Sequence, residues 1–427
     1  MSRSAPALLK RLDVPAAVAL SLLVQTIIAL LAASIPVLAP EIATDRGWNV
    51  DMIAFYAPIL YLAAFFFSFQ IPRILQQLGG MGLSLLCLAF SALGLLCLLP
   101  PSIALAVAAP LALGAANGGM NPASSQVLGP RTSARNAGII MSIKQTGVPL
   151  GGMLAGVLVP ILVLRSGWQG AVLSLAGASA LAAIALLPTV RWLNGARGSG
   201  QLASFRPLEP VKRIWAMPGM RSFIAAAMTF VAMQQCLRSF FTVYLVSALG
   251  FSLTTAGLAF GASQGAGIVG QILWAFAADR LIRPHAVMAI IGVVMSIAAL
   301  LTATFSSEWP VTAIVAVAML YGLSAAGFIP VVLGEVARRS APGEVGALTA
   351  GANTYLIVSM LVGPLVFGAV ASALGYAAAF TVFGMLSLAG AAIALPRAFL
   401  RNLAATGKSA DRRTARGATD IEERLPR

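Results

Sequence analysis

Charged side chains are scarce in this chain of 427 residues, because Asp, Glu, Lys and Arg together make up only 10% of it. A water-soluble domain has roughly a quarter of its residues charged, so a soluble protein is excluded. No Asp or Glu falls in the middle of a long apolar stretch, and the single histidine, His285, lies at the start of one. An ordinary proton relay through buried carboxylates or histidines is therefore excluded as well.

Cysteine is also rare. The three cysteines, Cys87, Cys97 and Cys236, lie within apolar stretches and have neither metal-ligand spacing nor a paired framework. The sequence also has no phosphate-binding loop, metal motif or nucleophile constellation. We therefore expect no disulfide, no metal, no cofactor and no enzymatic activity.

Long apolar stretches are abundant, since 59% of the residues are hydrophobic and the mean hydropathy is +0.91. A helix that crosses the hydrocarbon core needs about 20 mostly apolar residues, whereas barrel strands are shorter and alternate apolar with polar residues. The sequence predicts an all-α membrane protein with twelve transmembrane helices. The expected spans are Val14 to Leu38, Asp51 to Ile71, Met81 to Leu99, Ser102 to Leu128, Ala137 to Leu164, Trp168 to Pro188, Arg221 to Ala248, Thr254 to Ala278, His285 to Ser306, Trp309 to Val336, Gly346 to Leu374 and Tyr376 to Pro396.

The longest polar interruption, residues 191–220, predicts a linker between two six-helix bundles. The N-terminal bundle takes up residues 1–190 and the C-terminal bundle residues 221–396, followed by a basic tail of residues 397–427. Aligned on each other, the bundles pair Pro122 with Pro330 in a shared order of residues and loops. This indicates parallel repeats with a substrate site at their interface.

The positions of the basic residues predict the orientation. With both termini on one side, almost all Lys and Arg collect on that side, and only Arg46 and Arg165 lie on the other. The positive-inside rule then places both termini in the cytoplasm. The tail is expected to be a disordered topology anchor, with binding to anionic lipid as the alternative.

Three motifs carry a family resemblance. Residues 270–283, which include Asp279-Arg280, resemble the signature loop between the second and third helices of a major facilitator superfamily half. Residues 144–152 resemble the Gly/Pro-rich fifth-helix motif of that superfamily, and residues 334–346 are similar to bacterial permeases of the cyanate and organic-anion type. The resemblance covers essentially the whole chain and implies an alternating-access carrier in a bacterial inner membrane.

The same resemblance implies a cytoplasmic gate. In the first bundle the signature loop reads Pro72-Arg73 where the pattern has Asp-Arg, and Val127 stands opposite Glu335. Both acidic members are absent there, so we expect an asymmetric gate held chiefly by the second bundle. Ordinary solvated helix ends would explain the same charges. The expected gating residues are Asp279, Arg280, Arg283, Glu335 and Arg73.

Small residues recur in two of the expected helices. They allow helices to approach closely in lipid, and we expect packing rather than binding from them. The residues concerned are Gly147, Pro149, Gly151, Gly152, Gly363 and Pro364.

Two cations, Lys144 and Arg238, lie inside apolar stretches. A charge in mid-bilayer costs at least about 2.5–3.5 kcal/mol, so a retained one indicates a functional site. We expect both to face one solvent-filled cavity between the bundles; the alternative is that they anchor helices by hydrogen bonds to backbone carbonyls. Gln234 shares a helix face with Arg238 at i, i+4. The other expected substrate-binding residues are Gln25, Asn121, Gln145, Asn117, Gln264, Tyr321, Asn353 and Tyr355.

A positive cavity predicts a secondary carrier for a small anionic solute of the carboxylate type. Uptake against an inside-negative potential would require a co-transported cation or exchange for an internal counter-anion. A symported proton would ride on the substrate or on Lys144. The lipid bilayer is the only other expected partner, and nucleic acid is not expected.

Two alternatives remain open. The fifth-helix motif and the apolar cavity walls favour a multidrug efflux antiporter, although a pump for cations usually needs an embedded carboxylate. A membrane sensor without transport is the more remote alternative, because no signalling domain is visible.

Overall fold

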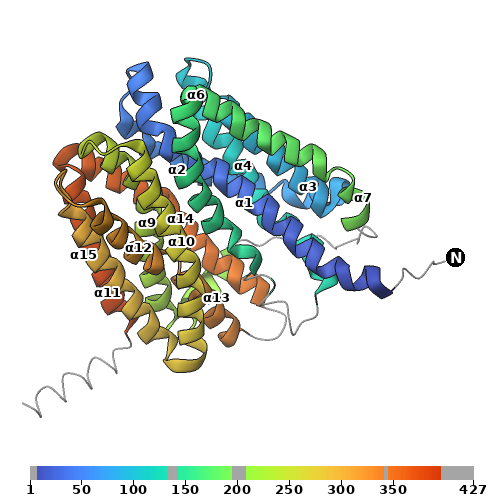
Figure 1. The fold of residues 1–427 in the computed structure, drawn as a ribbon. Coiled ribbons are helices and arrows are strands. Elements are labelled where there is room, and N and C mark those ends of the chain that lie inside the picture. The colour runs from blue at the N-terminus through green and yellow to red at the C-terminus, as the bar shows by residue number, and fades with distance from the viewer. Residues whose placement is uncertain (1–6, 133–139, 141–142, 195–207, 341–344, 396–427) are drawn as a thin grey trace, which may run out of the picture.

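The computed structural model describes residues 7–132, 140, 143–194, 208–340 and 345–395, and this part of the chain is helical with no β-strand (Figure 1). The all-α expectation is therefore confirmed.

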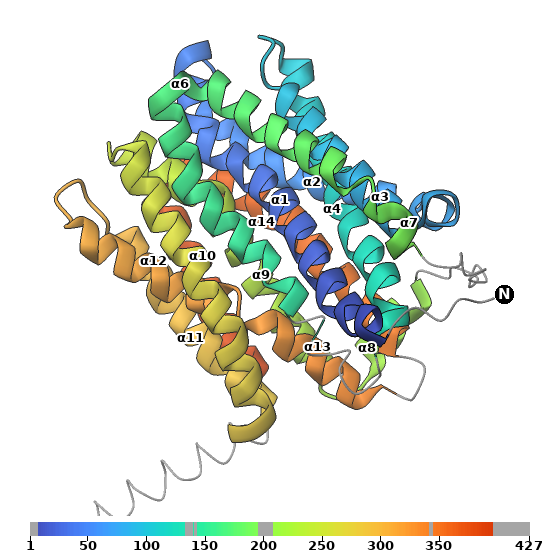
Figure 2. The same cartoon turned by 45° about the vertical axis from the view of Figure 1, so that its right-hand side comes forward.

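The helices form two groups that lie side by side (Figures 1 and 2). The first group contains α1 (Ala7–Arg46), α2 (Tyr56–Ser68), α3 (Ile71–Leu96), α4 (Ile103–Leu128), α6 (Gly147–Leu186) and α7 (Thr189–Leu193). The second group contains α9 (Met220–Val243), α10 (Leu253–Phe276), α11 (Pro284–Ala303), α12 (Val311–Ala325), α13 (Phe328–Arg339), α14 (Val345–Leu374) and α15 (Tyr376–Ala394). The shorter segments are the 3₁₀ turns η1 (Val50–Phe55) and η2 (Gly129–Arg131), the π turns η3 (Tyr244–Ala248) and η4 (Ala277–Leu281), and α8 (Leu208–Ala216), which packs on α14.

Nine helical segments among the described residues are long and apolar enough to cross a membrane. One of them contains α6, in which Gly167 adopts a φ of 71° and separates two arms that correspond to the expected spans 137–164 and 168–188. α9 and α10 have 24 residues each and are long enough, but their polar side chains leave them outside the nine. Membrane crossing by α9 and α10, and with it the count of twelve, stays a prediction.

α3 begins at Ile71, well before the expected start at Met81, and continues through a break at Gly79. Gly79 has a φ of 73°, a backbone angle that residues other than glycine rarely adopt. Asn194 fills the break, because its Oδ1 accepts a hydrogen bond from the backbone nitrogen of Met81 (2.8 Å) and its Nδ2 donates to the carbonyl of Leu78 (2.7 Å). The backbone groups freed by the kink are thereby satisfied, as a membrane-embedded chain requires.

The two ends of the molecule differ. We call the end where α1 begins the linker end, since α7, α8 and α13 also lie there, and the opposite end the far end (Figures 1 and 2). At the far end, Asp51 of η1 accepts hydrogen bonds from the hydroxyls of Tyr376 (3.0 Å) and Ser372 (3.4 Å) in the second group. The backbone of Gly368 in α14 lies against Ala54 of η1. The two groups are therefore in contact at the far end.

Close packing of α6 against α10 provides a second contact between the groups. A Cβ atom added at Gly156 would lie 2.5 Å from the backbone nitrogen of Gly261, and one added at Gly257 would overlap the carbonyl oxygen of Gly156. Only glycine permits this approach, which is the use of small residues expected for helices in lipid.

Candidate functional site

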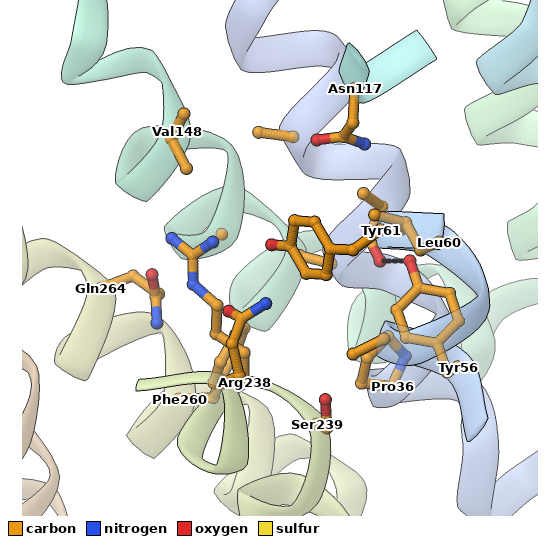
Figure 3. Close-up of a pocket in the computed structure, with 16 residues that line it drawn as sticks. Pro36, Tyr56, Leu60, Tyr61, Asn117, Val148, Arg238, Ser239, Phe260 and Gln264 are labelled. Atoms are coloured by element: carbon orange, nitrogen blue, oxygen red, sulfur yellow. Dashed lines mark hydrogen bonds between the residues drawn. The ribbon is translucent and has the colours of Figure 1, made fainter. Parts of the chain in front are cut away.

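A cavity lies between the two groups of helices, with an empty volume of about 560 Å³ that includes solvent-open space (Figure 3). α1, α2, α4 and α6 line it from the first group, and α9 and α10 from the second. The side chains at its wall are Ala29, Ala32, Ala33, Pro36, Tyr56, Ala57, Leu60, Tyr61, Asn117, Val148, Gly152, Gln235, Arg238, Ser239, Phe260 and Gln264.

Arg238 is the charged residue at this wall. Its guanidinium points from α9 into the cavity, where the hydroxyl of Tyr61 faces it (Figure 3). The wall contains no Asp or Glu, and no carboxylate among the described residues pairs with Arg238. Because a charge removed from water is costly unless it is paired, the cavity presents a positive charge that a bound anion would neutralise.

Amide and hydroxyl groups surround the guanidinium. Gln235 is 3% exposed, and its Oε1 is buried without a hydrogen-bond partner among the described residues. Asn117 donates from Nδ2 to the carbonyl of Leu113 (3.0 Å), one turn earlier in α4, so the carboxamide is held in place at the wall. The hydroxyl of Tyr56 donates to the carbonyl of Ala32 (2.5 Å), which ties α2 to α1 beside the cavity. The wall thus combines one cation with several neutral polar groups.

Lys144 lies outside this wall. It is 2% exposed, and its ammonium donates to Oδ1 of Asn121 at 2.5 Å. Val148 and Asn117, which do line the cavity, are each four residues away from this pair in sequence. In a helix that spacing corresponds to about 6 Å along the axis, so the pair lies one turn away from the cavity on the side of the linker end.

Other predicted binding residues lie near the cavity. Gln264 lines it, and together with Gln234 and Arg238 it also lines a smaller cavity between α9, α10 and α12. Gln25 donates from Nε2 to Oε1 of Gln145 (3.3 Å), and Gln25 Oε1 is buried without a partner among the described residues.

Three predicted binding residues are placed elsewhere. Tyr321 is fully buried, and its hydroxyl donates to the carbonyl of Met233 (3.1 Å). Tyr355 stacks on Trp215 of α8 and donates to the carbonyl of Val211 (3.2 Å). Asn353 is exposed, outside both cavities. These side chains tie helices together or face outward.

The structure adds four polar residues that sequence reasoning did not select, namely Tyr56, Tyr61, Gln235 and Ser239. Gln235 precedes Arg238 by three residues and Ser239 by four on the same helix, so helical spacing could have identified Gln235 from Arg238 and then Ser239 from Gln235. Tyr56 and Tyr61 carry no such signal, because an aromatic residue in an apolar span is usually part of the packing.

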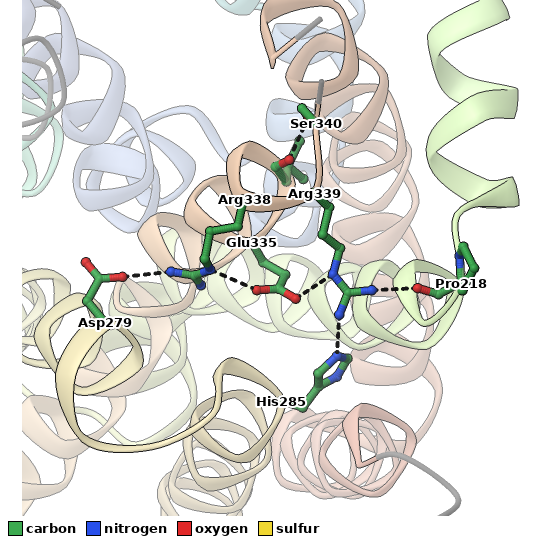
Figure 4. A network of polar contacts seen from close by, with 8 residues as sticks. Pro218, Asp279, His285, Glu335, Arg338, Arg339 and Ser340 are labelled. Carbon is green, nitrogen blue, oxygen red and sulfur yellow. Dashed lines mark hydrogen bonds and ion pairs between the residues drawn. The ribbon is translucent and has the colours of Figure 1, made fainter. Parts of the chain in front are cut away.

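At the linker end a polar cluster surrounds Glu335 of α13 (Figure 4). Its buried carboxylate accepts hydrogen bonds from Arg338 (3.1 Å) and Arg339 (2.6 Å), and Arg338 also bonds Asp279 (2.8 Å). Arg339 donates to the carbonyl of Pro218 (2.5 Å) and to His285 Nε2 (3.3 Å). The cluster ties α13 to η4, α11 and the segment before α9.

Some of the predicted gating residues belong to this cluster, and the others lie at the surface. Asp279 and Glu335 belong to the cluster, while Arg280, Arg283 and Arg73 are exposed and have no described ion pair. Sequence reasoning missed the role of Arg339.

The first group supplies an acidic partner from an unexpected place. Arg131 pairs with Asp13 of α1 (3.2 Å) and donates to the carbonyl of Val127 (2.7 Å). The structure thus gives each group ion pairs of its own at the linker end.

The predicted packing residues lie at helix contacts. A Cβ at Gly151 would lie 2.5 Å from the carbonyl oxygen of Thr26. Added Cβ atoms would likewise come within 3.2 Å of a neighbouring helix at Gly147, Gly152 and Gly363. Pro149 is buried in α6, and Pro364 lies inside α14.

A membrane protein whose two helix groups enclose a cavity with a charged side chain at its wall has the architecture of a solute transporter. The family model of the Major Facilitator Superfamily matches residues 21–281 and 223–421, so the chain belongs to that superfamily. No curated protein sequence matches the chain.

Three solved structures of transporters illustrate the similarity in fold. The nucleoside transporter NupG, in a mutant form, is 16% identical with a TM-score of 0.72, covering 88% of this chain and 98% of its own. A POT family transporter in complex with 5-aminolevulinic acid is 13% identical with a TM-score of 0.71, covering 88% and 94%. A bacterial homologue of the human lysosomal transporter Spinster, in an inward-facing and occupied conformation, is 15% identical with a TM-score of 0.68, covering 88% and 95%. These similarities establish the fold.

Proposed function

We propose that this transporter is a secondary carrier for a small anionic solute of the carboxylate type. The observation that carries the proposal is Arg238, whose guanidinium points into the cavity between the groups without a carboxylate partner among the described residues. A carboxylate about 4 Å from such a cation gains on the order of 4 kcal/mol at an effective dielectric near 20. The same wall offers nothing to neutralise a cationic drug, which disfavours the multidrug alternative.

The carrier would expose this cavity to each side of the membrane in turn. The contacts between Asp51, Tyr376 and Ser372 close the groups together at the far end, which supports access from the linker end in this state. We place the termini in the cytoplasm of a bacterial inner membrane because of the asymmetric Lys and Arg distribution. Net uptake of an anion would then need a co-transported cation or exchange for an internal anion.

Lys144 takes a secondary place in this proposal. Its ammonium is bonded to Asn121, one turn from the cavity toward the linker end. We assign it to the route between the cavity and that end, so that a departing anion passes a second cation after leaving Arg238.

The test is ligand binding and flux of the full chain. Purified protein is screened by thermal shift against small mono- and dicarboxylates, and hits are tested for uptake into proteoliposomes. Arg238→Gln should abolish both signals, while Arg165→Gln, which removes an exposed arginine of α6 at the far end, should leave both intact. Carboxylate binding that survives Arg238→Gln would refute the proposal. A rise in melting temperature with lipophilic cations, and with none of the carboxylates, would refute it as well.

A further inference from the structure

We propose, building on the function above, that the solute is a small monocarboxylate carrying a neutral hydrogen-bond donor, such as a hydroxyl, close to its carboxylate. Three features of the cavity wall carry this: a cation without a carboxylate partner among the described residues, a buried acceptor near it that has no partner there either, and a set of apolar side chains.

The charge of the wall fits one carboxylate. Arg238 is the ionised side chain at the wall, and a guanidinium binds one carboxylate through two parallel hydrogen bonds. Lys144 is outside the wall and is already bonded to Asn121. A dicarboxylate would therefore bring a second negative charge into a wall that has one positive charge, and the surplus charge would be desolvated without compensation.

The orphaned acceptor is Oε1 of Gln235. Gln235 lines the cavity and is only 3% exposed. Its Oε1 atom has no hydrogen-bond partner among the described residues. An unmade hydrogen bond of a buried acceptor costs about 1–3 kcal/mol, which a ligand donor would recover. A cation donor is excluded by the neighbouring Arg238, so the donor is neutral.

The position of that donor follows from the helix. Gln235 and Arg238 are three residues apart on α9, where Cβ atoms lie about 5–6 Å from each other. Side chains that start this close together on one helix can reach groups on adjacent or next-nearest carbon atoms of one small molecule. The donor is thus expected on carbon 2 or carbon 3 of the acid.

Part of the wall is apolar. Ala29, Ala33, Leu60, Val148 and Phe260 offer no polar side-chain atoms, so they suit a short alkyl group. A 2-hydroxy acid with a methyl group, such as lactate, combines all three requirements.

The experiment compares lactate with propionate, which lacks only the hydroxyl, and with malate, which adds a second carboxylate. Dissociation constants are measured by titration calorimetry on the purified full chain and on Arg238→Gln. We expect lactate to bind roughly tenfold more tightly than propionate, the worth of about one hydrogen bond, and malate to bind more weakly than lactate.

Two variants test whether Gln235 causes the expected preference for lactate over propionate. Gln235→Met keeps the shape of the side chain without its amide and should reduce the ratio of lactate affinity to propionate affinity to about one. Thr229→Val, on the same helix with its hydroxyl bonded to the carbonyl of Ala226, is the matched control and should preserve the ratio. The ratio in the unaltered chain tests the inference even if Gln235→Met fails to fold.

The outcomes separate the inference from the function on which it rests. Arg238-dependent binding of carboxylates with equal affinity for lactate and propionate, or with a preference for malate, would overturn the inference and leave the proposed function standing. Absence of any carboxylate binding that depends on Arg238 would overturn both.

Discussion

The hydroxyl of Tyr376 in α15 donates a hydrogen bond of 3.0 Å to the carboxylate of Asp51 in η1, and this contact joins the second group of helices to the first. Asp51 lies next to Asn49, whose Oδ1 accepts from the backbone nitrogen of Asp51 (2.8 Å) and so fixes the turn. Ser372 adds a longer bond to the same carboxylate (3.4 Å). At the far end, one acidic side chain thus accepts hydrogen bonds from two hydroxyls of the other group.

Tyr376→Phe should therefore favour conformations that are open at the far end. The variant removes one hydrogen bond to a carboxylate, worth about 1.5–3 kcal/mol, from the state in which the groups touch at the far end. Spin labels at Ser166→Cys and Ser307→Cys, exposed positions at the far end of the two groups, would report the change as a larger fraction of long distances. An unchanged distance distribution would show that Asp51 and Tyr376 do not hold the groups together.

Gly156→Ala should weaken the contact between α6 and α10. The added methyl group meets backbone atoms of Gly257 and Gly261, which cannot move aside as a flexible side chain can. Overpacking of this kind costs roughly 1–3 kcal/mol, more than the helix propensity gained by replacing glycine. Differential scanning fluorimetry should show a lower Tm. Gly177→Ala in the other arm of α6 has no atom within 4 Å and is the control; equal shifts for both would contradict the prediction.

Glu335→Gln should destabilise the second group more than Asp279→Asn. The Glu335 side chain is 8% exposed and bonds two arginines, whereas that of Asp279 is 62% exposed and bonds one. We expect a loss of about 1–3 kcal/mol for the buried carboxylate and of about 0–1 kcal/mol for the exposed one. Denaturant titration of the two variants, with Arg280→Gln as an unpaired reference, measures the difference. Equal losses would mean that Glu335 is not the centre of the cluster.

Asn121→Leu should be destabilising on its own and tolerated together with Lys144→Met. The single change leaves the Lys144 ammonium, which is 2% exposed, without the acceptor it has now. We expect the single variant to lose roughly 1–3 kcal/mol and the double variant to recover most of it. A double-mutant cycle measures this coupling. Additive losses would show that the two side chains do not depend on each other.

Much of the fold could be read from the sequence because membrane spans are marked by hydropathy alone. The helical class, the polar segment before α9 and the position of most spans follow from that pattern. The break of α3 at Gly79 could not, since it depends on Asn194, which is distant in sequence and reaches back to the kink. The acid opposite Arg131 was missed for the same reason, because Asp13 comes from a different helix.

Only part of the candidate site could be predicted from the sequence. Arg238, Asn117 and Gln264 stood out as polar residues in apolar spans, and the structure places them at one wall. Lys144 looked equivalent to Arg238 in sequence, yet it lies one helical turn from the cavity wall toward the linker end and bonds Asn121 there. Tyr321 and Tyr355 were indistinguishable by pattern from Tyr61, because the packing around a helix decides whether a hydroxyl meets a carbonyl or a cavity.

α9 lies at the centre of the second group, with most of its side chains from Met220 to Val243 buried. It falls short of the hydropathy that a lone span needs, because Gln234, Gln235 and Arg238 interrupt its apolar sequence. A segment of this composition partitions poorly into lipid as a single helix. Insertion of α9 is therefore expected to depend on the helices that surround it, because in the folded protein they bury Gln234 and Gln235.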